Sequence, residues 1–161
     1  LVVTRNATDI FRVTSESPFL YFEPVEELWK QHVLGDYDAT FMDDVIDGCG
    51  FEIITLNTLQ VSHRLGESKH RSELCTLYVR EHRQDFKIYI SDPPAELIRR
   101  DLRLTVDNPE DLALCRIVYT NFKNSAPRIQ VNQIVEFLDN NPDLIKLIAP
   151  YTELGYKTMY K

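Results

Sequence analysis

Two acidic residues stand in matching positions, each after a candidate strand and shortly before a proline. Glu16 lies in RVTSESP and Asp107 lies in RLTVDNP. A carboxylate in such a turn either accepts hydrogen bonds from backbone N–H groups or binds a hard cation such as Mg²⁺. Each motif alone fits both interpretations, because such junctions are common. If the two strands are parallel, both acids emerge at one sheet edge, where two carboxylates can hold one Mg²⁺ between nucleotide phosphates and a substrate.

The segment around Asp107 predicts the elements that would position this acid. Apolar and polar residues alternate over 102–106, which is the period-two pattern of a strand. Asn108 is a favourable helix N-cap, Pro109 suits the first helical turn, and an apolar helical pattern follows. Asp107 is therefore expected at the carboxyl end of a strand, at the edge of an open α/β sheet where ligands bind.

The remaining pattern predicts strands that alternate with helices. The expected strands of one sheet are 9–14, 50–55, 86–90 and 102–106, and residues 1–4 could form another. Helices are expected from Pro24, from Asn57 with Gln60 as a capping box, over 68–82, from Pro109, over 129–138 and over 142–148. The acidic segment 35–50 is interpreted as a solvated loop. This alternation favours an α/β layer structure.

Composition is typical of one soluble globular domain. The chain has 161 residues, of which 43% are hydrophobic and 27% charged. A formal net charge of -7 argues against a general nucleic-acid binder. No apolar run has membrane-spanning length, and no signal peptide is visible. Three cysteines without CxxC spacing favour a reduced, cytoplasmic protein. Because the chain begins without a methionine, we expect a fragment or a processed product.

The common catalytic signatures are absent from the sequence. It contains no GxGxxG, GxxxxGK[ST], HExxH or GxSxG motif. The four histidines are scattered along the chain, so we interpret them as surface residues rather than metal ligands: His32, His63, His70 and His82. The cysteines are expected to pack rather than to react. The paired acidic motifs therefore carry the strongest chemical signal.

Five segments in sequence order resemble a known family. RVTSESPFLYFEPV resembles RVTGDxPLIDPxxI, and LRLTVDNPEDLALCRIVY resembles LRLTVDTPEDLxLxxxIY. IDGCGFEI is similar to PDGLDVEV, SELCTLYVREHRQDFKI to REHVTPYIxxxPxxFxI, and IVEFLDNNPDLIKL to ILxLLxxNPEL. The family is the spore coat polysaccharide type of cytidylyltransferase, related to the 3-deoxy-manno-octulosonate and acylneuraminate cytidylyltransferases. The resemblance extends from Asp9 to Leu147.

The resemblance implies a fold and an activity. The fold is a nucleotide-diphospho-sugar transferase-like (Rossmann-like) α/β/α sandwich, one domain over 1–161 with 127–161 as a helical carboxyl-terminal extension. Members transfer CMP from CTP to a sugar and release pyrophosphate with Mg²⁺, here for surface or spore coat polysaccharide. The implied partners are CTP and a sugar, with no nucleic acid or membrane, and the helical tail would suit a homodimer.

The resemblance also implies site residues. Glu16 and Asp107 fall on the two catalytic, metal-binding acids. The residues expected to contact the substrates lie in the same and the intervening segments: Arg12, Gly48, Glu52 and Arg103. The family's first strand and its basic glycine loop, of the type RLPGK, would lie before Leu1, so the resemblance implies an amino-terminally truncated domain.

Three positions depart from the family pattern. Glu16 stands where the family has Asp, Gly50 replaces an acid, and Leu74 replaces a histidine on the presumed sugar side. These departures favour an alternative, a non-catalytic relative that acts as a sugar-binding or assembly module.

Overall fold

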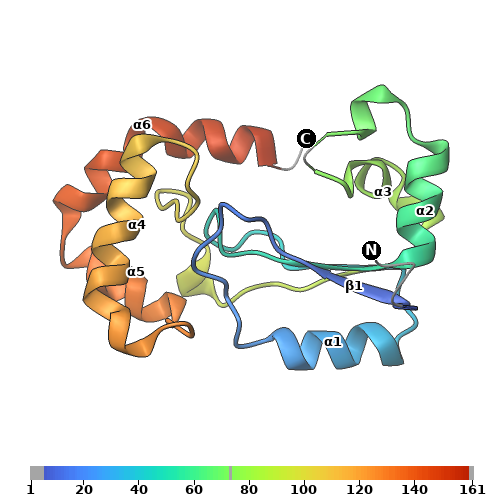
Figure 1. The fold of residues 1–161 in the computed structure, drawn as a ribbon, viewed down its shortest axis with the longest axis horizontal. Coiled ribbons are helices and arrows are strands. Elements are labelled where there is room, and N and C mark those ends of the chain that lie inside the picture. The colour runs from blue at the N-terminus through green and yellow to red at the C-terminus, as the bar shows by residue number, and fades with distance from the viewer. Residues whose placement is uncertain (1–5, 73, 160–161) are drawn as a thin grey trace.

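A mixed sheet of four strands forms the centre of the fold (Figure 1). The computed structural model describes residues 6–72 and 74–159, so the candidate strand 1–4 lies outside the described residues. The strands are β1 (Asp9–Arg12), β2 (Ala39–Phe41), β3 (Glu52–Thr55) and β4 (Ile88–Ile90), in the order β1-β3-β2-β4. β3 is antiparallel to both of its neighbours, whereas β2 and β4 are parallel. The condition that two parallel strands bring Glu16 and Asp107 to one sheet edge is not met, because residues 102–106 are not a strand of this sheet.

Three of the four predicted strands are confirmed in shorter form, and the fourth is wrong. Residues 102–106 make only an isolated bridge, between Arg103 and Asp47. The backbone of this segment pairs with loops instead of the sheet: Leu104 N donates to Asp47 O at 2.7 Å, and Val106 N donates to Glu16 O at 2.9 Å. The alternating pattern thus identified an extended, buried segment but not its pairing partner.

β2 is the strand that the sequence pattern missed. It lies within the acidic segment 35–50, which we interpreted as a solvated loop, yet all three of its residues are fully buried. Three residues without alternation give too short a signal for a period-two search. The interpretation of this segment as a loop is wrong for the strand itself, which is an inner strand of the sheet.

The long helices appear where they were expected. They are α1 (Val25–Leu34), α2 (Leu56–Leu65), α4 (Pro109–Phe122), α5 (Val131–Asp139) and α6 (Pro142–Met159). Thr55 rather than Asn57 caps α2, because its hydroxyl accepts the N–H of Thr58 at 3.1 Å. The helix predicted over 68–82 is broken into η2 (Ser68–His70) and α3 (Leu77–Glu81), and α6 continues past Pro150. Further 3₁₀ turns are η3 (Arg83–Asp85), η4 (Ala95–Leu97) and η5 (Lys123–Ser125).

The helices form two groups around the sheet. In Figure 1, α1 runs along one face of the sheet, α2 and α3 lie at one end, and α4, α5 and α6 gather at the other. The side chains of Ile134, Leu138 and Ile148 are completely buried, which confirms that α5 and α6 pack into the core. Within residues 6–72 and 74–159, every helix is too short or too polar to cross a lipid bilayer.

Two histidines are buried rather than exposed, which corrects the sequence interpretation. His32 on α1 joins its Nδ1 to Thr40 Oγ1 at 2.8 Å and its Nε2 to Asp9 Oδ1 at 3.3 Å, so it connects the helix to the sheet. His70 in η2 contacts Glu81 Oε2 through Nε2 at 2.8 Å. Both rings are buried because polar partners satisfy their nitrogens. Cys49 and Cys115 are buried, in agreement with a packing role.

Candidate functional site

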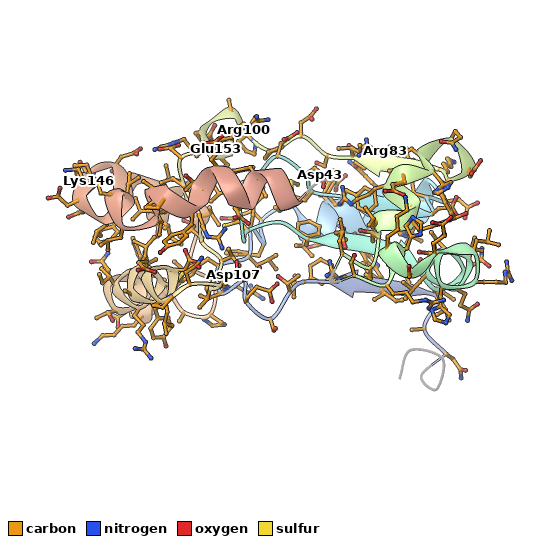
Figure 2. The ribbon with its side chains drawn as sticks, turned by 90° about the horizontal axis from the view of Figure 1, so that it is seen from above. Asp43, Arg83, Arg100, Asp107, Lys146 and Glu153 are labelled. Atoms are coloured by element: carbon orange, nitrogen blue, oxygen red, sulfur yellow. The ribbon has the colours of Figure 1, made fainter. Side chains whose placement is uncertain are left out.

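All six residues expected at the site line one cavity of about 650 Å³. They are Arg12, Glu16, Gly48, Glu52, Arg103 and Asp107. The walls come from the end of β1 and the segment that follows it, from residues between β2 and β3 with Glu52 of β3, and from residues 103–107 and Gly155 of α6. Ser72, Leu74 and, from α3, Arg80 complete the lining. Asp43 and Asp107, both of which line this cavity, lie in the middle of the molecule between the two helical groups (Figure 2). The cavity therefore collects side chains from distant parts of the sequence.

The two acidic motifs meet through their backbones. Val106 N donates to Glu16 O at 2.9 Å, and the Thr105 hydroxyl also reaches Glu16 O at 3.5 Å. Asp107 follows directly after this contact, so both acids reach the same cavity although the segment before Asp107 is not a strand of the sheet. The Glu16 carboxylate accepts a bond from Ser15 Oγ at 3.3 Å. A metal ion shared by Glu16 and Asp107 stays a prediction.

Gly48 allows the turn before β3 to touch the Asp107 segment. Its φ of 88° lies in the left-handed region, which favours glycine. A Cβ at this position would lie 2.5 Å from Thr105 N and 2.6 Å from Leu104 C. The backbones therefore approach as closely as only glycine permits, and this approach places Asp47 beside Arg103.

Arg103 is surrounded by three carboxylates, which we call the Arg103 cluster: Asp47, Asp107 and Asp111 with Arg103 itself. Nη1 donates to Asp47 Oδ2 at 3.0 Å, Nε donates to Asp111 Oδ1 at 3.0 Å, and Nη2 is paired with Asp107. The other oxygen of Asp111 accepts the backbone N–H of Asn108 at 2.9 Å as part of the capping box of α4. One buried aspartate thus fixes both the helix start and the arginine.

The electrostatics of the Arg103 cluster are unbalanced. Burial raises the pKa of Asp47 to about 6, Arg103 opposes this shift, and Asp107 and Asp111 add to it. Burial also disfavours the charge of Asp111, but hydrogen bonds from Arg103 and Asn108 lower its pKa overall. At neutral pH three carboxylates thus face one guanidinium, so the cluster carries an excess of two negative charges. Such a region attracts cations.

A second group, the Arg80 cluster, consists of Arg12, Asp43, Glu52 and Arg80. Glu52 Oε2 accepts from Arg12 Nη1 at 2.8 Å, and its Oε1 accepts from Arg80 Nη2 at 2.9 Å and from Thr76 Oγ1 at 2.6 Å. Both oxygens of Glu52 are therefore occupied by the protein. Its direct role is to hold two guanidinium groups against the cavity wall.

Arg80 forms the most extensive contacts of this cluster. It donates to both oxygens of Asp43, at 2.8 and 3.0 Å, and its guanidinium lies 3.9 Å from the centroid of the Phe41 ring. Among these four residues two acids balance two arginines, so their formal charges sum to zero. The planar fork of arginine is required for such simultaneous contacts.

Sequence reasoning missed four residues of these clusters: Asp43, Asp47, Arg80 and Asp111. Asp47 stood in the recognised segment IDGCGFEI, and Asp111 at the third helical position after Asn108 was a readable capping signal. Asp43 was taken for part of a solvated loop. Nothing in the sequence around Arg80 marks it as a site residue, because its partners lie 28 and 37 positions away.

The metal-binding capacity of the protein side chains is limited. Across the part of the chain that the structure describes, no group of three or more His, Cys, Asp and Glu side chains is arranged to hold an ion. In the Arg103 cluster the guanidinium itself lies among the three carboxylates. A cation at Glu16 and Asp107 would therefore need further oxygen ligands, such as phosphates.

Comparisons with known proteins agree with the resemblance seen in the sequence. No protein-family model matches the chain. The chain is 25% identical over 148 residues to the uncharacterized protein MJ1063 of Methanocaldococcus jannaschii, covering 92% of this chain and 60% of that protein. It is 24% identical over 135 residues to the spore coat polysaccharide biosynthesis protein SpsF of Bacillus subtilis, covering 83% of this chain and 56% of that protein.

A solved structure matches the fold. The structure of a cytidylyltransferase from Leptospira borgpetersenii aligns with a TM-score of 0.77 and 21% sequence identity, covering 89% of this chain and 61% of that one. The chain thus spans about 60% of the length of the proteins it matches. By sequence it is related to a spore coat polysaccharide biosynthesis protein, and by structure it has the nucleotide-diphospho-sugar transferase-like fold of a cytidylyltransferase.

Proposed function

We propose that the protein is a nucleotidyltransferase that transfers CMP from CTP to a sugar during polysaccharide biosynthesis. The observation that carries the proposal is the convergence of the two acidic motifs on one cavity, through the contact between Val106 N and Glu16 O at 2.9 Å. The relationship to SpsF and the cytidylyltransferase fold support the same conclusion.

The donor set of the cavity fits a hard cation. Glu16 and Asp107 supply carboxylate oxygens, the ligands that Mg²⁺ prefers, and the excess negative charge of the Arg103 cluster favours a cation beside them. These two acids would hold Mg²⁺, which when bound would neutralise charge on the CTP phosphates. The ion would bind only with nucleotide, because two carboxylates alone replace few of its waters.

The chain's own residues would position the reactants. In the reaction a sugar hydroxyl attacks the α-phosphorus, the bond to the β-phosphate oxygen breaks, and pyrophosphate and a proton are released. Arg12 and Arg103, held in fixed orientations by their carboxylate partners, would direct N–H donors and positive charge toward the substrates. Glu52 would act through Arg12, and Gly48 would keep the turn close to the Asp107 segment.

The test is CTP-dependent pyrophosphate release by the protein that carries this chain. Asp107→Ala and Glu16→Ala should each lower the rate at least about a hundredfold, because each removes a charge from the reacting centre. Glu16→Asp should retain most of the activity, since it restores the family residue. Folding is checked by circular dichroism and thermal melting. Wild-type rates in either alanine variant would refute the assignment of these acids.

The second candidate function is a non-catalytic sugar-binding or assembly module. Leu74 favours it, because this apolar residue lines the cavity where the family has a histidine. Calorimetric titration with CTP and with acidic and neutral sugars separates the two. Sugar binding without any pyrophosphate release in the wild-type protein would support the module. A cytoplasmic location and a homodimer through the helical tail stay predictions.

A further inference from the structure

The three carboxylates around Arg103 differ in their exposure. The side chain of Asp111 is 0% exposed and that of Asp47 is 11% exposed, whereas that of Asp107 is 53% exposed. A half-exposed ion pair contributes little to stability, because solvent screens the attraction. A buried partner is costly to lose, because the remaining charge stays unpaired. Arg103 therefore depends on Asp47 and Asp111 and has only a weak hold on Asp107.

Arg103 is also confined without any help from Asp107. Its Nη1 and Nε each donate at 3.0 Å to a buried aspartate. On the side of α6, a Cβ at Gly155 would come within 2.5 Å of Nη1, so the helix backbone closes over the guanidinium. With Asp47 and Asp111 in place, the positive charge of Arg103 already faces two negative charges. Release of Asp107 would leave Arg103 in position.

Asp107 has a second possible partner in the same cavity. The proposed cation would bind the same carboxylate whose Oδ2 now accepts from Arg103 and from Thr105 Oγ1 at 3.4 Å. A guanidinium and a divalent cation compete when they require one carboxylate, because each supplies the positive charge that the other would.

We propose that Asp107 alternates between two partners, Arg103 in the nucleotide-free protein and the divalent cation when nucleotide is bound. Arg103 is thus a positioning residue that holds the Asp107 carboxylate in the cavity and lowers its affinity for a free cation. This inference rests on the proposed function for the identity of the cation site. It adds that the protein suppresses cation binding until the phosphates of the nucleotide supply further ligands.

The direct test is titration of the nucleotide-free protein with Mn²⁺, followed by electron paramagnetic resonance of the free ion. Arg103→Gln should bind Mn²⁺ about tenfold more tightly than the wild type, because removal of the competing charge leaves the carboxylates available. Arg100→Gln is the matched control: it removes the same charge from an arginine whose side chain is 76% exposed, and it should leave the affinity unchanged. Equal or weaker Mn²⁺ binding by folded Arg103→Gln would overturn the proposal.

A second measurement keeps the proposal testable if Arg103→Gln fails to fold. Thermal melting should show that Asp107→Asn changes the melting temperature by less than about 2 °C, whereas Asp111→Asn lowers it several times more. An equal loss in both variants would overturn the proposal, since Asp107 would then be a fixed partner of Arg103.

The two proposals fail in different ways. Tighter Mn²⁺ binding by Arg103→Gln in a protein without pyrophosphate release would uphold the exchange of partners and refute the transferase. Pyrophosphate release by the wild-type protein, together with unchanged Mn²⁺ binding in Arg103→Gln, would uphold the transferase and refute the exchange of partners.

Discussion

Two charged clusters line the cavity, and they differ in the balance between acidic and basic side chains. In the Arg80 cluster two arginines meet two acids, and every oxygen of Asp43 and Glu52 accepts a bond from the protein. In the Arg103 cluster one arginine meets three acids, and one of these, Asp107, is half exposed. The formal charges of the Arg80 cluster sum to zero, whereas those of the Arg103 cluster leave an excess of negative charge.

This difference separates residues that shape the cavity from residues that can change partners. A balanced, buried network holds the segment after β2, strand β3 and helix α3 in one arrangement, and disruption leaves unpaired charges. An unbalanced cluster contains a carboxylate that can bind a ligand in place of its protein partner. We therefore expect variants in the two clusters to differ in whether they affect stability or ligand binding.

The largest effect is expected from the residue that is common to the helix start and the Arg103 cluster. Asp111→Ala should lower the free energy of unfolding by about 4 kcal/mol, because it removes a buried partner of Arg103 and the capping box of α4. Urea unfolding measures the change. As the control, Glu110→Ala alters the neighbouring acid of the same helical turn. An equal decrease in the free energy of unfolding in both variants would mean that the buried pair of Asp111 and Arg103 does not contribute more than an ordinary acid of this turn.

The balanced cluster is tested through Arg80. Arg80→Met should lower the free energy of unfolding by about 3 kcal/mol, since Glu52 and Asp43 would lose a buried cation. Arg80→Lys should recover only part of this loss, because the three N–H donors of an ammonium cannot reproduce the four hydrogen bonds of the guanidinium. Full recovery by lysine in denaturant titrations would show that charge alone, and not the fork of hydrogen bonds, maintains the cluster.

The pH dependence of the free energy of unfolding should reflect the titration of Asp47. Its pKa in the folded protein, about 6, lies above the ordinary value near 4. The folded state therefore holds this proton more tightly, so the contribution of Asp47 to stability is greatest below about pH 4 and is lost as the pH rises through 6. Despite burial, hydrogen bonds lower the pKa of Asp111 and the surrounding carboxylates raise the pKa of Arg103, so both neighbours stay charged in this range.

Asp47→Asn removes that titration. Between pH 4 and pH 7 the stability of Asp47→Asn relative to the wild type should shift in favour of the variant by about 2 kcal/mol. Urea titrations at several pH values measure the shift, with Asp43→Asn in the balanced cluster as the control. Parallel pH profiles for Asp47→Asn and the wild type would contradict a raised pKa of Asp47.

The smallest effect on stability is expected at Gly155, where alanine should destabilise the protein instead of stabilising the helix. Within a helix, Gly→Ala commonly stabilises by about 1 kcal/mol. Here the new Cβ would lie 2.5 Å from Arg103 Nη1 and 2.7 Å from Asp47 Oδ2, so Gly155→Ala should instead destabilise by about 1 kcal/mol. Thermal melting decides the sign. A more stable Gly155→Ala variant would show that α6 does not close over the Arg103 cluster.

The sequence by itself determined local features of the segments that carry cavity residues. Period-two alternation predicted strands that overlap β1, β3 and β4, and the Asn108 cap with Pro109 predicted the start of α4. These predictions succeeded because alternation, capping and proline geometry are local properties, set by residues within a few positions of one another. The same reasoning predicted the burial of Ile134 and Leu138.

Only the tertiary structure decided how those residues are paired. Arg103 and Asp47 are 56 positions apart, and Arg12 and Glu52 are 40 apart, so no local pattern connects them. The wrong prediction of a strand over 102–106 and the failure to predict β2 have the same cause. Whether a segment joins a sheet depends on which backbone lies alongside it. The charges were visible in the sequence, but their balance depends on burial and on distances between atoms, and folding sets both.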